Sequence, residues 1–473
     1  MKLFTQKAPF ACENLLYFLL AGVFCATFCA SSVGQSLPNN LPLPDASGWL
    51  STYSTAGNID LTNPFFQSLG TNGRSCGTCH TPTEAWTITP QDVKFRFLLT
   101  GGTEPIFRPV DGANCPSADV STVQARKKAY SQLLSKGLLR ISIAVPDNAH
   151  YVITNVQDPY NCPETTTTQP AMYRRPLPAT NLPFLSAVMW DGRESVSGPV
   201  PGKSLDLTQS LTNQAHDATM GHAQASTPPS PTQLAQIVAF ETAMSTAQAF
   251  DWSAGWLTSA GASGGAVNLS AQPFYMGIND SLGGDPQGNA FNPNAFSLYN
   301  SWATAQEKNA LSRYRQSVAR GQVLFNTLPI QITGVGGLND ALNQPMIMGT
   351  CTTCHDSPNV GNHSYSVPLA IGTTAYPAMR ALDIAGLPVY TIQCDDGTQV
   401  QVTDPGRALS TGNCADIGKV KGPVLRGLAG RAPYFHNGAA ASLDAVVDFY
   451  NQRFNLNLSP QQKADLVAFL QTL

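Results

Sequence analysis

The sequence predicts a mainly α-helical protein made of two similar domains with long loop insertions. The chain has 473 residues, which is enough for two domains. A five-residue cysteine motif occurs twice, at 76–80 and at 351–355, and helical patterns lie before and after the second copy. The 39 glycines and 35 prolines predict many turns and long loops between the helices.

The first 35 residues have the layout of a secretory signal peptide. Lys2 and Lys7 precede an apolar run, 15–30, which ends in small residues. An N-terminal membrane anchor is the alternative interpretation. No later stretch approaches eighteen apolar residues, so we expect a periplasmic protein without stable membrane insertion after signal cleavage. Charged residues make up only 12% of the chain and the net charge is -3, which excludes a nucleic-acid binder with a basic stripe.

Helical patterns and capping residues place the regular elements. Capping boxes at 230–233 and 459–462 each have proline at the first helical position. Gly321 and Phe325 have the spacing that lets two helices cross closely. The sequence predicts helices over 122–136, 230–247, 306–325 and 459–473, an extended lead-in over 36–60, a surface excursion over 251–300 and a small hairpin over 389–402.

The repeated motif is C-x-x-C-H, the attachment signature of c-type haem. Two thiols add to the vinyl groups of one haem, and the following histidine becomes the proximal ligand of its iron. A zinc ribbon would need further Cys or His pairs at knuckle spacing, and a thioredoxin-like pair would need a βαβ pattern; the sequence has neither. It therefore predicts two covalently bound haem c groups, with iron ligands His80 and His355. The attachment residues are Cys76, Cys79, His80, Cys351, Cys354 and His355.

Four other cysteines lie singly in loop-like contexts. Because neighbours in sequence pair most readily, we expect the disulfides Cys115–Cys162 and Cys394–Cys414. Two other connectivities remain open at this stage.

A helix on each side of C-x-x-C-H is the minimal way to wrap a haem, and this arrangement resembles the class I cytochrome c fold. We infer two such domains. After the signal peptide, 1–35, the N-terminal domain covers 36–300 with insertions, and the C-terminal domain covers 301–473.

Three further segments carry a family resemblance. They are Asn-Pro-Phe-Phe at 63–66, Trp-Asp-Gly-Arg at 190–193, and the run from Lys421 through Ala-Pro-Tyr-Phe-His-Asn-Gly to Tyr450. With the two haem motifs, this ordered set resembles the bacterial dihaem cytochrome c peroxidase and MauG family. The resemblance implies an exported oxidoreductase that depends on hydrogen peroxide. Its first haem reacts with peroxide and its second relays electrons from a small redox protein or a protein substrate.

The resemblance also assigns single residues. Trp190 would be a relay between the haems, His436 would lie beside the second haem, and Arg426 would bind propionates. Tyr450 stands where dihaem peroxidases have Met and MauG-type proteins have Tyr, so it would be the sixth ligand of the second iron. The simpler alternatives are a core tryptophan, a loop histidine, a surface ion pair and a helix-packing tyrosine.

The distal side of the first haem departs from the family. No Met or His occurs in the forty residues after His80, which leaves that iron open. Gln214 matches the family's Gln, but the Glu position falls on Gln224, which cannot exchange a proton. His222, or with less support His216, would then be the acid/base. Either histidine, or Met220, would instead block the site if it bound the iron.

Arg175 and Arg431 stand where the family's interdomain calcium site needs neutral ligands, so the sequence leaves calcium possible but doubtful. Two other functions stay open. One is a non-catalytic dihaem electron-transfer cytochrome with both irons six-coordinate. The other is a haem oxygenase-type enzyme that acts on an organic substrate, which the long insertions would permit.

Overall fold

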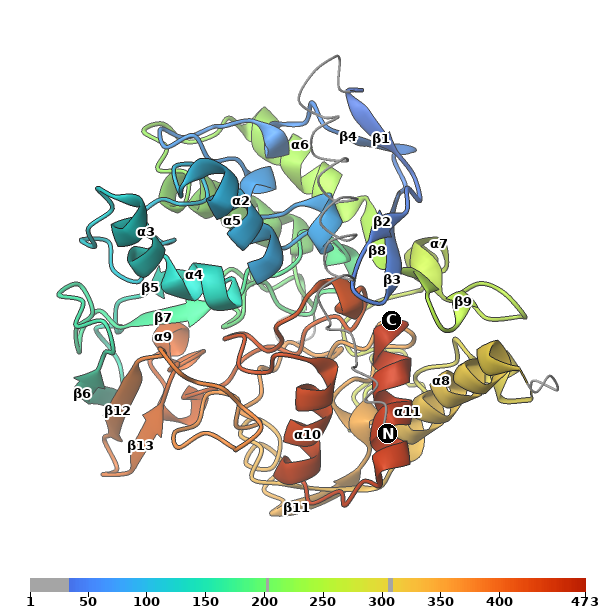
Figure 1. Cartoon of the computed structure of the whole chain (residues 1–473). Coiled ribbons are helices and arrows are strands. Elements are labelled where there is room, and N and C mark those ends of the chain that lie inside the picture. The colour runs from blue at the N-terminus through green and yellow to red at the C-terminus, as the bar shows by residue number, and fades with distance from the viewer. Residues whose placement is uncertain (1–33, 201–203, 305–308) are drawn as a thin grey trace, which may run out of the picture.

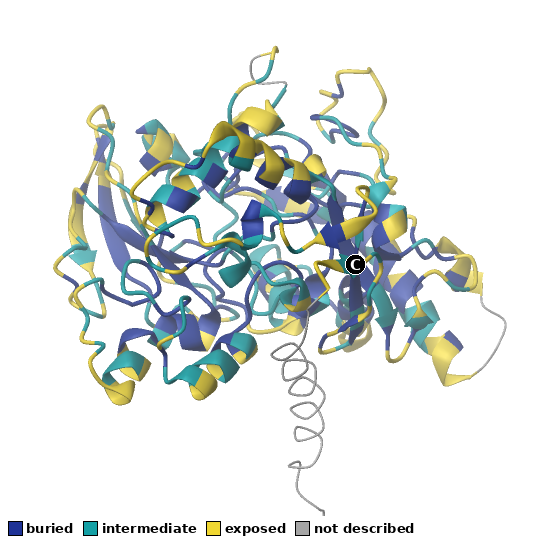
Figure 2. Cartoon of the chain, turned by 90° about the horizontal axis from the view of Figure 1, so that it is seen from above, coloured by how far each residue is buried: buried dark blue, intermediate teal, exposed yellow. Residues whose placement is uncertain are grey.

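The computed structural model describes residues 34–200, 204–304 and 309–473 (Figure 1). The predicted signal peptide falls almost entirely on 1–33, outside the described residues. Within these ranges, no helix combines the length and the apolar character that a membrane crossing requires. Buried residues gather in the inner strands and inner helix faces, and exposed residues follow the outer helix faces and peripheral loops (Figure 2).

The described residues form a mixed α and β structure. About 30% of them are helical, and ten α-helices stand beside five small sheets, so the expected mainly α fold is not confirmed. The helices are α2 (Pro90–Thr100), α3 (Val123–Ala129), α4 (Ser131–Lys136), α5 (Leu207–Gly221), α6 (Pro231–Thr242), α7 (Gly265–Ser270), α8 (Ala310–Thr327), α9 (Ala408–Thr411), α10 (Leu443–Arg453) and α11 (Pro460–Gln471). The strands are β1 (Ser36–Pro38), β2 (Leu43–Pro44), β3 (Gly48–Ser54), β4 (Asn58–Asp60), β5 (Leu139–Ser142), β6 (Tyr151–Gln157), β7 (Ala171–Arg174), β8 (Met244–Asp251), β9 (Gly255–Trp256), β10 (Ile330–Thr333), β11 (Met346–Gly349), β12 (Val389–Cys394) and β13 (Gln399–Val402).

The predicted helices form at the expected places, but two of them are shorter than predicted. Both capping boxes form, at Ser230 and at Ser459. The helix predicted over 122–136 is interrupted at Tyr130, whose buried hydroxyl donates to the carbonyl of Phe107 at 2.9 Å. The helix that begins at Pro231 ends at Thr242, because the following residues pair with β3 as strand β8.

Strands replace the predicted extended lead-in. The lead-in over 36–60 forms β1 to β4, and β3 pairs antiparallel with β8 along its whole length. The predicted hairpin is confirmed as β12 and β13, and Gly397 has the positive φ of 84° that its turn requires. β6, from the N-terminal part of the chain, pairs with β12 and completes a three-stranded sheet at the lower left of Figure 1.

The largest hydrophobic core lies between α8 and α11, which lie side by side in Figure 1. A side chain on Gly321 would place its Cβ only 1.9 Å from the carbonyl oxygen of Asp465, so the predicted close crossing is confirmed. The prediction of a surface excursion over 251–300 is confirmed only in part. Trp252 and Trp256 are exposed, whereas Leu257, Phe296 and Tyr299 are buried in this core.

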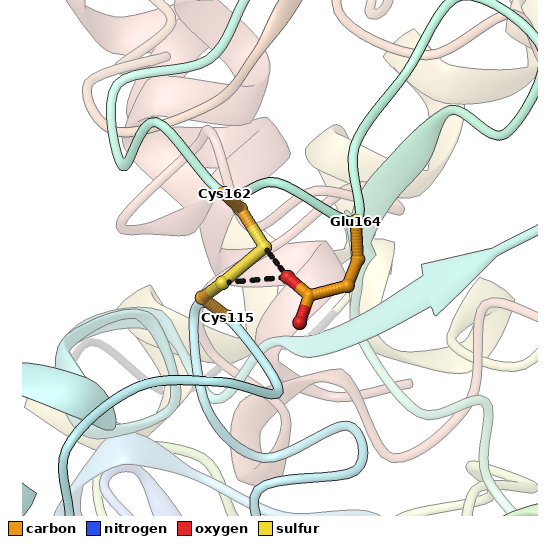
Figure 3. A group of neighbouring side chains, drawn as sticks. All are labelled: Cys115, Cys162 and Glu164. Atoms are coloured by element: carbon orange, nitrogen blue, oxygen red, sulfur yellow. Dashed lines mark hydrogen bonds between the residues drawn. A yellow bond between two sulfur atoms is a disulfide. The ribbon is translucent and has the colours of Figure 1, made fainter.

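Both predicted disulfides are present, Cys115–Cys162 and Cys394–Cys414. Figure 3 shows the carboxylate of Glu164 directed at both sulfurs of the first pair, with S···O separations of 3.0 and 2.8 Å. This is the only group of three neighbouring metal-type ligands among the residues that the structure describes. Because its two sulfurs are bonded to each other, they offer no thiolate to a metal ion.

Candidate functional site

The two haem motifs have the same local geometry. Each Cys pair lies on one turn of 3-10 helix, Cys76–Thr78 in the first copy and Cys351–Thr353 in the second. The Nδ1 atom of His80 is 3.0 Å from the carbonyl oxygen of Trp86, and the Nδ1 atom of His355 is 2.6 Å from that of Gly361. Because a carbonyl only accepts, Nδ1 carries the proton and the Nε2 lone pair stays free for iron.

The environment of both motifs suits neutral ligands. Burial lowers the pKa of His80 and His355, which favours the neutral imidazole over the protonated form. Burial raises the pKa of Cys76, Cys351 and Cys354 to about 12, so these sulfurs are not thiolates near neutral pH. A thioether to haem needs no charge on sulfur. Among the described residues, neither motif belongs to a group of three or more side chains placed around one metal ion, which a zinc site would need.

A cavity opens beside the first motif, with about 1590 Å³ of space not filled by protein atoms, part of it open to solvent. All three residues that the sequence nominated as catalytic line it. They are Trp190, Gln214 and His222, and the first-motif residues Cys76, Cys79 and His80 share the same walls. The structure thus brings the predicted distal residues and the predicted iron ligand to one space.

One face of α5 forms a wall of this cavity. Gln214 and Ala218 lie one turn apart on that face, and His222 follows at the C-terminal end of the helix. His216 lies off this wall, partly exposed to solvent and paired with Asp217 at 2.7 Å. Gln224 also lies outside the lining, and its side-chain oxygen accepts from Asn72 at 3.2 Å. Of the distal candidates that can exchange a proton, the cavity holds His222.

His222 is backed by a buried carboxylate that the sequence did not reveal. Its Nδ1 is 2.5 Å from one oxygen of Asp111, and the other oxygen accepts from Arg74 at 2.5 Å. Burial opposes ionisation of Asp111, but the hydrogen bonds and charges of His222 and Arg74 lower its pKa. A carboxylate in this place fixes the imidazole tautomer, so that Nε2 is free toward the cavity. No local pattern marks Asp111, because it lies 111 residues away from His222.

Glu241 is a second residue that the sequence analysis missed. It lies on α6, it is only 6% exposed, and it lines the cavity near Cys76. Burial raises the pKa of Glu241 to about 8. The available signal was an acidic residue on the otherwise apolar face that carries Leu234 and Ile237.

Glu241→Gln should stabilise the protein in alkaline solution. The folded state keeps a proton that the unfolded chain releases above pH 4.5, so wild-type stability falls as pH rises from 4.5 to about 8. Glutamine has no such charge, and we expect the variant to gain up to about 4 kcal/mol over wild type at pH 9 and little at pH 4. Thermal melts across this range, with the exposed Asp147→Asn as control, measure the difference. Parallel pH profiles for wild type and variant would contradict it.

Trp190 lines the cavity, and its indole ring lies beside the imidazole of His436. The indole Nε1 of Trp190 donates to the carbonyl of Arg175 at 2.8 Å, and its ring centroid is 6.1 Å from that of His436. His436 is 1% exposed, and its Nε2 is 3.7 Å from a carboxylate oxygen of Asp404. Burial lowers the pKa of His436 to about 4, so a neutral imidazole lies beside the indole.

Among the described residues, Arg426 and the partly buried Arg431 each have side-chain donors without hydrogen-bond partners. Arg426 is 0% exposed, so it is not a surface ion pair. Its Nη1 donates at 2.7 Å to the carbonyl of Asn359, in the loop after the second motif, whereas its Nε and Nη2 have no hydrogen-bond partner. Arg431 lines the first cavity with the same two atoms unpaired. Burial lowers the pKa of Arg426 to about 10 and that of Arg431 to about 9, so both remain cations at neutral pH. Buried cations need anions, and haem propionates have the required charge and geometry.

Tyr450 lies on α10 in a cluster with Phe435, Phe449 and Met379. It is half-buried, and burial raises its pKa, as do the nearby sulfurs of the second motif. The structure therefore places Tyr450 near the second haem motif, and Met379 shares that neighbourhood.

No family model matches the chain, but several curated proteins do. It is 35% identical over 141 residues to cytochrome-c peroxidase IdrP2 of Denitromonas iodatirespirans, a match that covers 26% of this chain and 36% of the relative. It is 30% identical over 191 residues to cytochrome-c peroxidase IdrP1 of Pseudomonas sp. strain SCT, covering 35% and 41%. A third relative is cytochrome c551 peroxidase of Nitrosomonas europaea, 29% identical over 147 residues and covering 29% and 36%.

The chain is thus similar to cytochrome c peroxidases over about a quarter to a third of its length. It matches well under half the length of each of these curated relatives. A solved MauG-like protein associated with microbial copper homeostasis aligns with 94% of this chain and 95% of its own chain, at 16% identity and a TM-score of 0.38.

Proposed function

We propose that the protein is an exported dihaem c-type cytochrome that reduces hydrogen peroxide or uses it as an oxidant. The observation that carries the proposal is the shared cavity of the first motif, where His80 and the Asp111-backed His222 both line the wall. An iron ligand and a positioned acid/base in one cavity are the two parts that peroxide chemistry needs.

Within that cavity, the haem would supply the iron that binds and reduces peroxide. His222 takes a proton from the incoming peroxide and returns it to the departing oxygen, while Asp111 holds the imidazole in one tautomer. Gln214 lies two turns before His222 on the same face of α5, and its amide orients peroxide. Reduction of hydrogen peroxide to two waters consumes two protons and two electrons, so the site needs a route for each.

We assign the electron route to Trp190 and His436. Trp190 lines the first cavity and its ring lies against His436, and the loop that carries His436 reaches the cluster around Tyr450. Arg426 and Arg431 would pair with propionates of the two haems. The first haem would belong to 36–300 and the second to 301–473, with Tyr450 as sixth iron ligand. The electron donor would be a small redox protein or a side chain of a protein substrate.

We propose that the protein works in the periplasm, which is an oxidising compartment. The two disulfides support export to the periplasm, because such bonds persist outside the reducing cytosol.

The test uses the holoprotein purified from a host that matures c-type cytochromes. We expect two haem equivalents per chain, a high-spin component in the ferric spectrum at room temperature, and oxidation of a reduced cytochrome when peroxide is added. A colourless product, or one haem, would contradict the proposal. Purely low-spin spectra without turnover would favour the electron-transfer cytochrome, and peroxide-dependent oxidation of an organic compound alone would favour the oxygenase-type enzyme.

A further inference from the structure

Arg175 is buried in a cradle of backbone oxygens between the two parts of the chain. It follows β7 and is 5% exposed. Its Nη1 donates to the carbonyls of Lys136 at 3.0 Å and Gly137 at 3.4 Å. Its Nη2 donates to the carbonyls of Ile88 at 2.6 Å and Arg431 at 3.1 Å. Three of these oxygens come from the N-terminal part and one from the C-terminal part.

The cradle is shaped for this side chain. A Cβ on Gly137 would lie 2.2 Å from the Nη1 of Arg175, and the φ of Gly137 is +61°. Glycine is therefore required both by the backbone conformation and by the space that the guanidinium fills.

The positive charge is balanced by oxygen dipoles rather than by a carboxylate. Among the described residues, no Asp or Glu forms an ion pair with Arg175. The carboxyl group of Glu84 acts on it only at longer range. Burial lowers the pKa of Arg175 to about 10, which leaves the guanidinium charged at neutral pH.

Converging neutral oxygens are also what a calcium ion selects. A calcium ion and a guanidinium cannot share one set of carbonyls, because their charges repel and the space is filled. The interdomain calcium that the family resemblance implies therefore does not fit this cradle. We propose that Arg175 is a built-in cation that replaces calcium at the junction of the two parts, so that the holoprotein is independent of calcium.

The backbone of Arg175 also hydrogen-bonds to both residues of the proposed electron route. The backbone N–H of Arg175 donates to the carbonyl of His436 at 2.6 Å, and its carbonyl accepts from the indole of Trp190 at 2.8 Å. A fixed cation at this point thus fixes the relative positions of Trp190 and His436.

The first experiment uses the wild-type holoprotein and does not depend on peroxide activity. We expect elemental analysis to find no stoichiometric calcium after gel filtration, and Tm to be the same in EGTA and in 1 mM calcium. One tightly bound calcium per chain, or a Tm that falls in EGTA, would overturn the proposal.

The second experiment empties the cradle. Arg175→Ala should lower Tm by about 5 °C or more, and low millimolar guanidinium or calcium should restore part of the loss. Arg126→Ala is the matched control, because its guanidinium also donates to carbonyls, those of Gly101 and Val120, but within the N-terminal part alone. The control should show no rescue by either cation. Equal behaviour of the two variants would refute a special role for Arg175. If Arg175→Ala does not fold, Arg175→Gln is measured in its place, with the same expected rescue.

Discussion

Replacing His222 with glutamine should lower peroxide turnover by about 10²- to 10⁴-fold, the usual contribution of a positioned general acid/base. Glutamine keeps the size and one polar contact to Asp111 but cannot exchange a proton. Stopped-flow mixing of the holoprotein with peroxide, followed at the haem absorption band, measures the rate directly. The haem content and the ferric spectrum should stay as in wild type, because His222 is not proposed to bind iron.

Two further variants separate chemistry from structure at this site. Asp111→Asn should cost roughly 10- to 100-fold, because it removes the negative charge that orients the imidazole and stabilises its protonated form. His216→Gln lies on the same helix α5 but outside the cavity lining, so it should leave the rate unchanged. A wild-type rate in His222→Gln would remove this histidine from the mechanism. A change of spin state in the same variant would instead identify it as an iron ligand.

Replacing Tyr450 should change the second haem rather than the first. A phenolate favours ferric iron, so Tyr450→Met should raise the reduction potential of that haem on the order of 100 mV. Tyr450→Phe should remove the sixth ligand and add a second high-spin component to the ferric spectrum. Spectroelectrochemical titration of both variants measures these effects.

Controls for Tyr450 come from the same part of the molecule. Tyr314→Phe removes a hydroxyl that donates to Gln471 at 3.1 Å in the α8–α11 region, away from the Tyr450 cluster, and should leave both haems unchanged. Met379→Leu tests the other candidate ligand in that cluster. If Met379→Leu alters the second haem and Tyr450→Phe does not, the assignment of Tyr450 is wrong.

The features that were predicted correctly are those that depend mainly on residues close together in the sequence. The two C-x-x-C-H motifs, the capping boxes at Ser230 and Ser459 and the disulfides lie where we predicted them. Each depends on residues that are close in sequence or on a covalent bond between cysteines, so spacing carries the information.

Features that depend on distant partners were missed. The predicted helix over 230–247 includes the start of Met244–Asp251, but that segment is a strand because β3 is available to pair with it. The partner of His222 is a carboxylate on a distant loop, and the acidity of Glu241 depends on the walls around it. Such contacts cannot be predicted from a single sequence, because tertiary packing decides which distant residues meet.

The pairing of β6 with β12 has a practical consequence for dissecting the molecule. A truncated protein that begins near residue 301 would lack β6, and the edge of β12 from Val389 to Cys394 would lose its backbone partners. Such an uncovered edge invites other chains to add to it. Separate expression of residues 301–473 should therefore yield aggregates or swapped oligomers, unless the segment Tyr151–Gln157 is supplied as a fused strand.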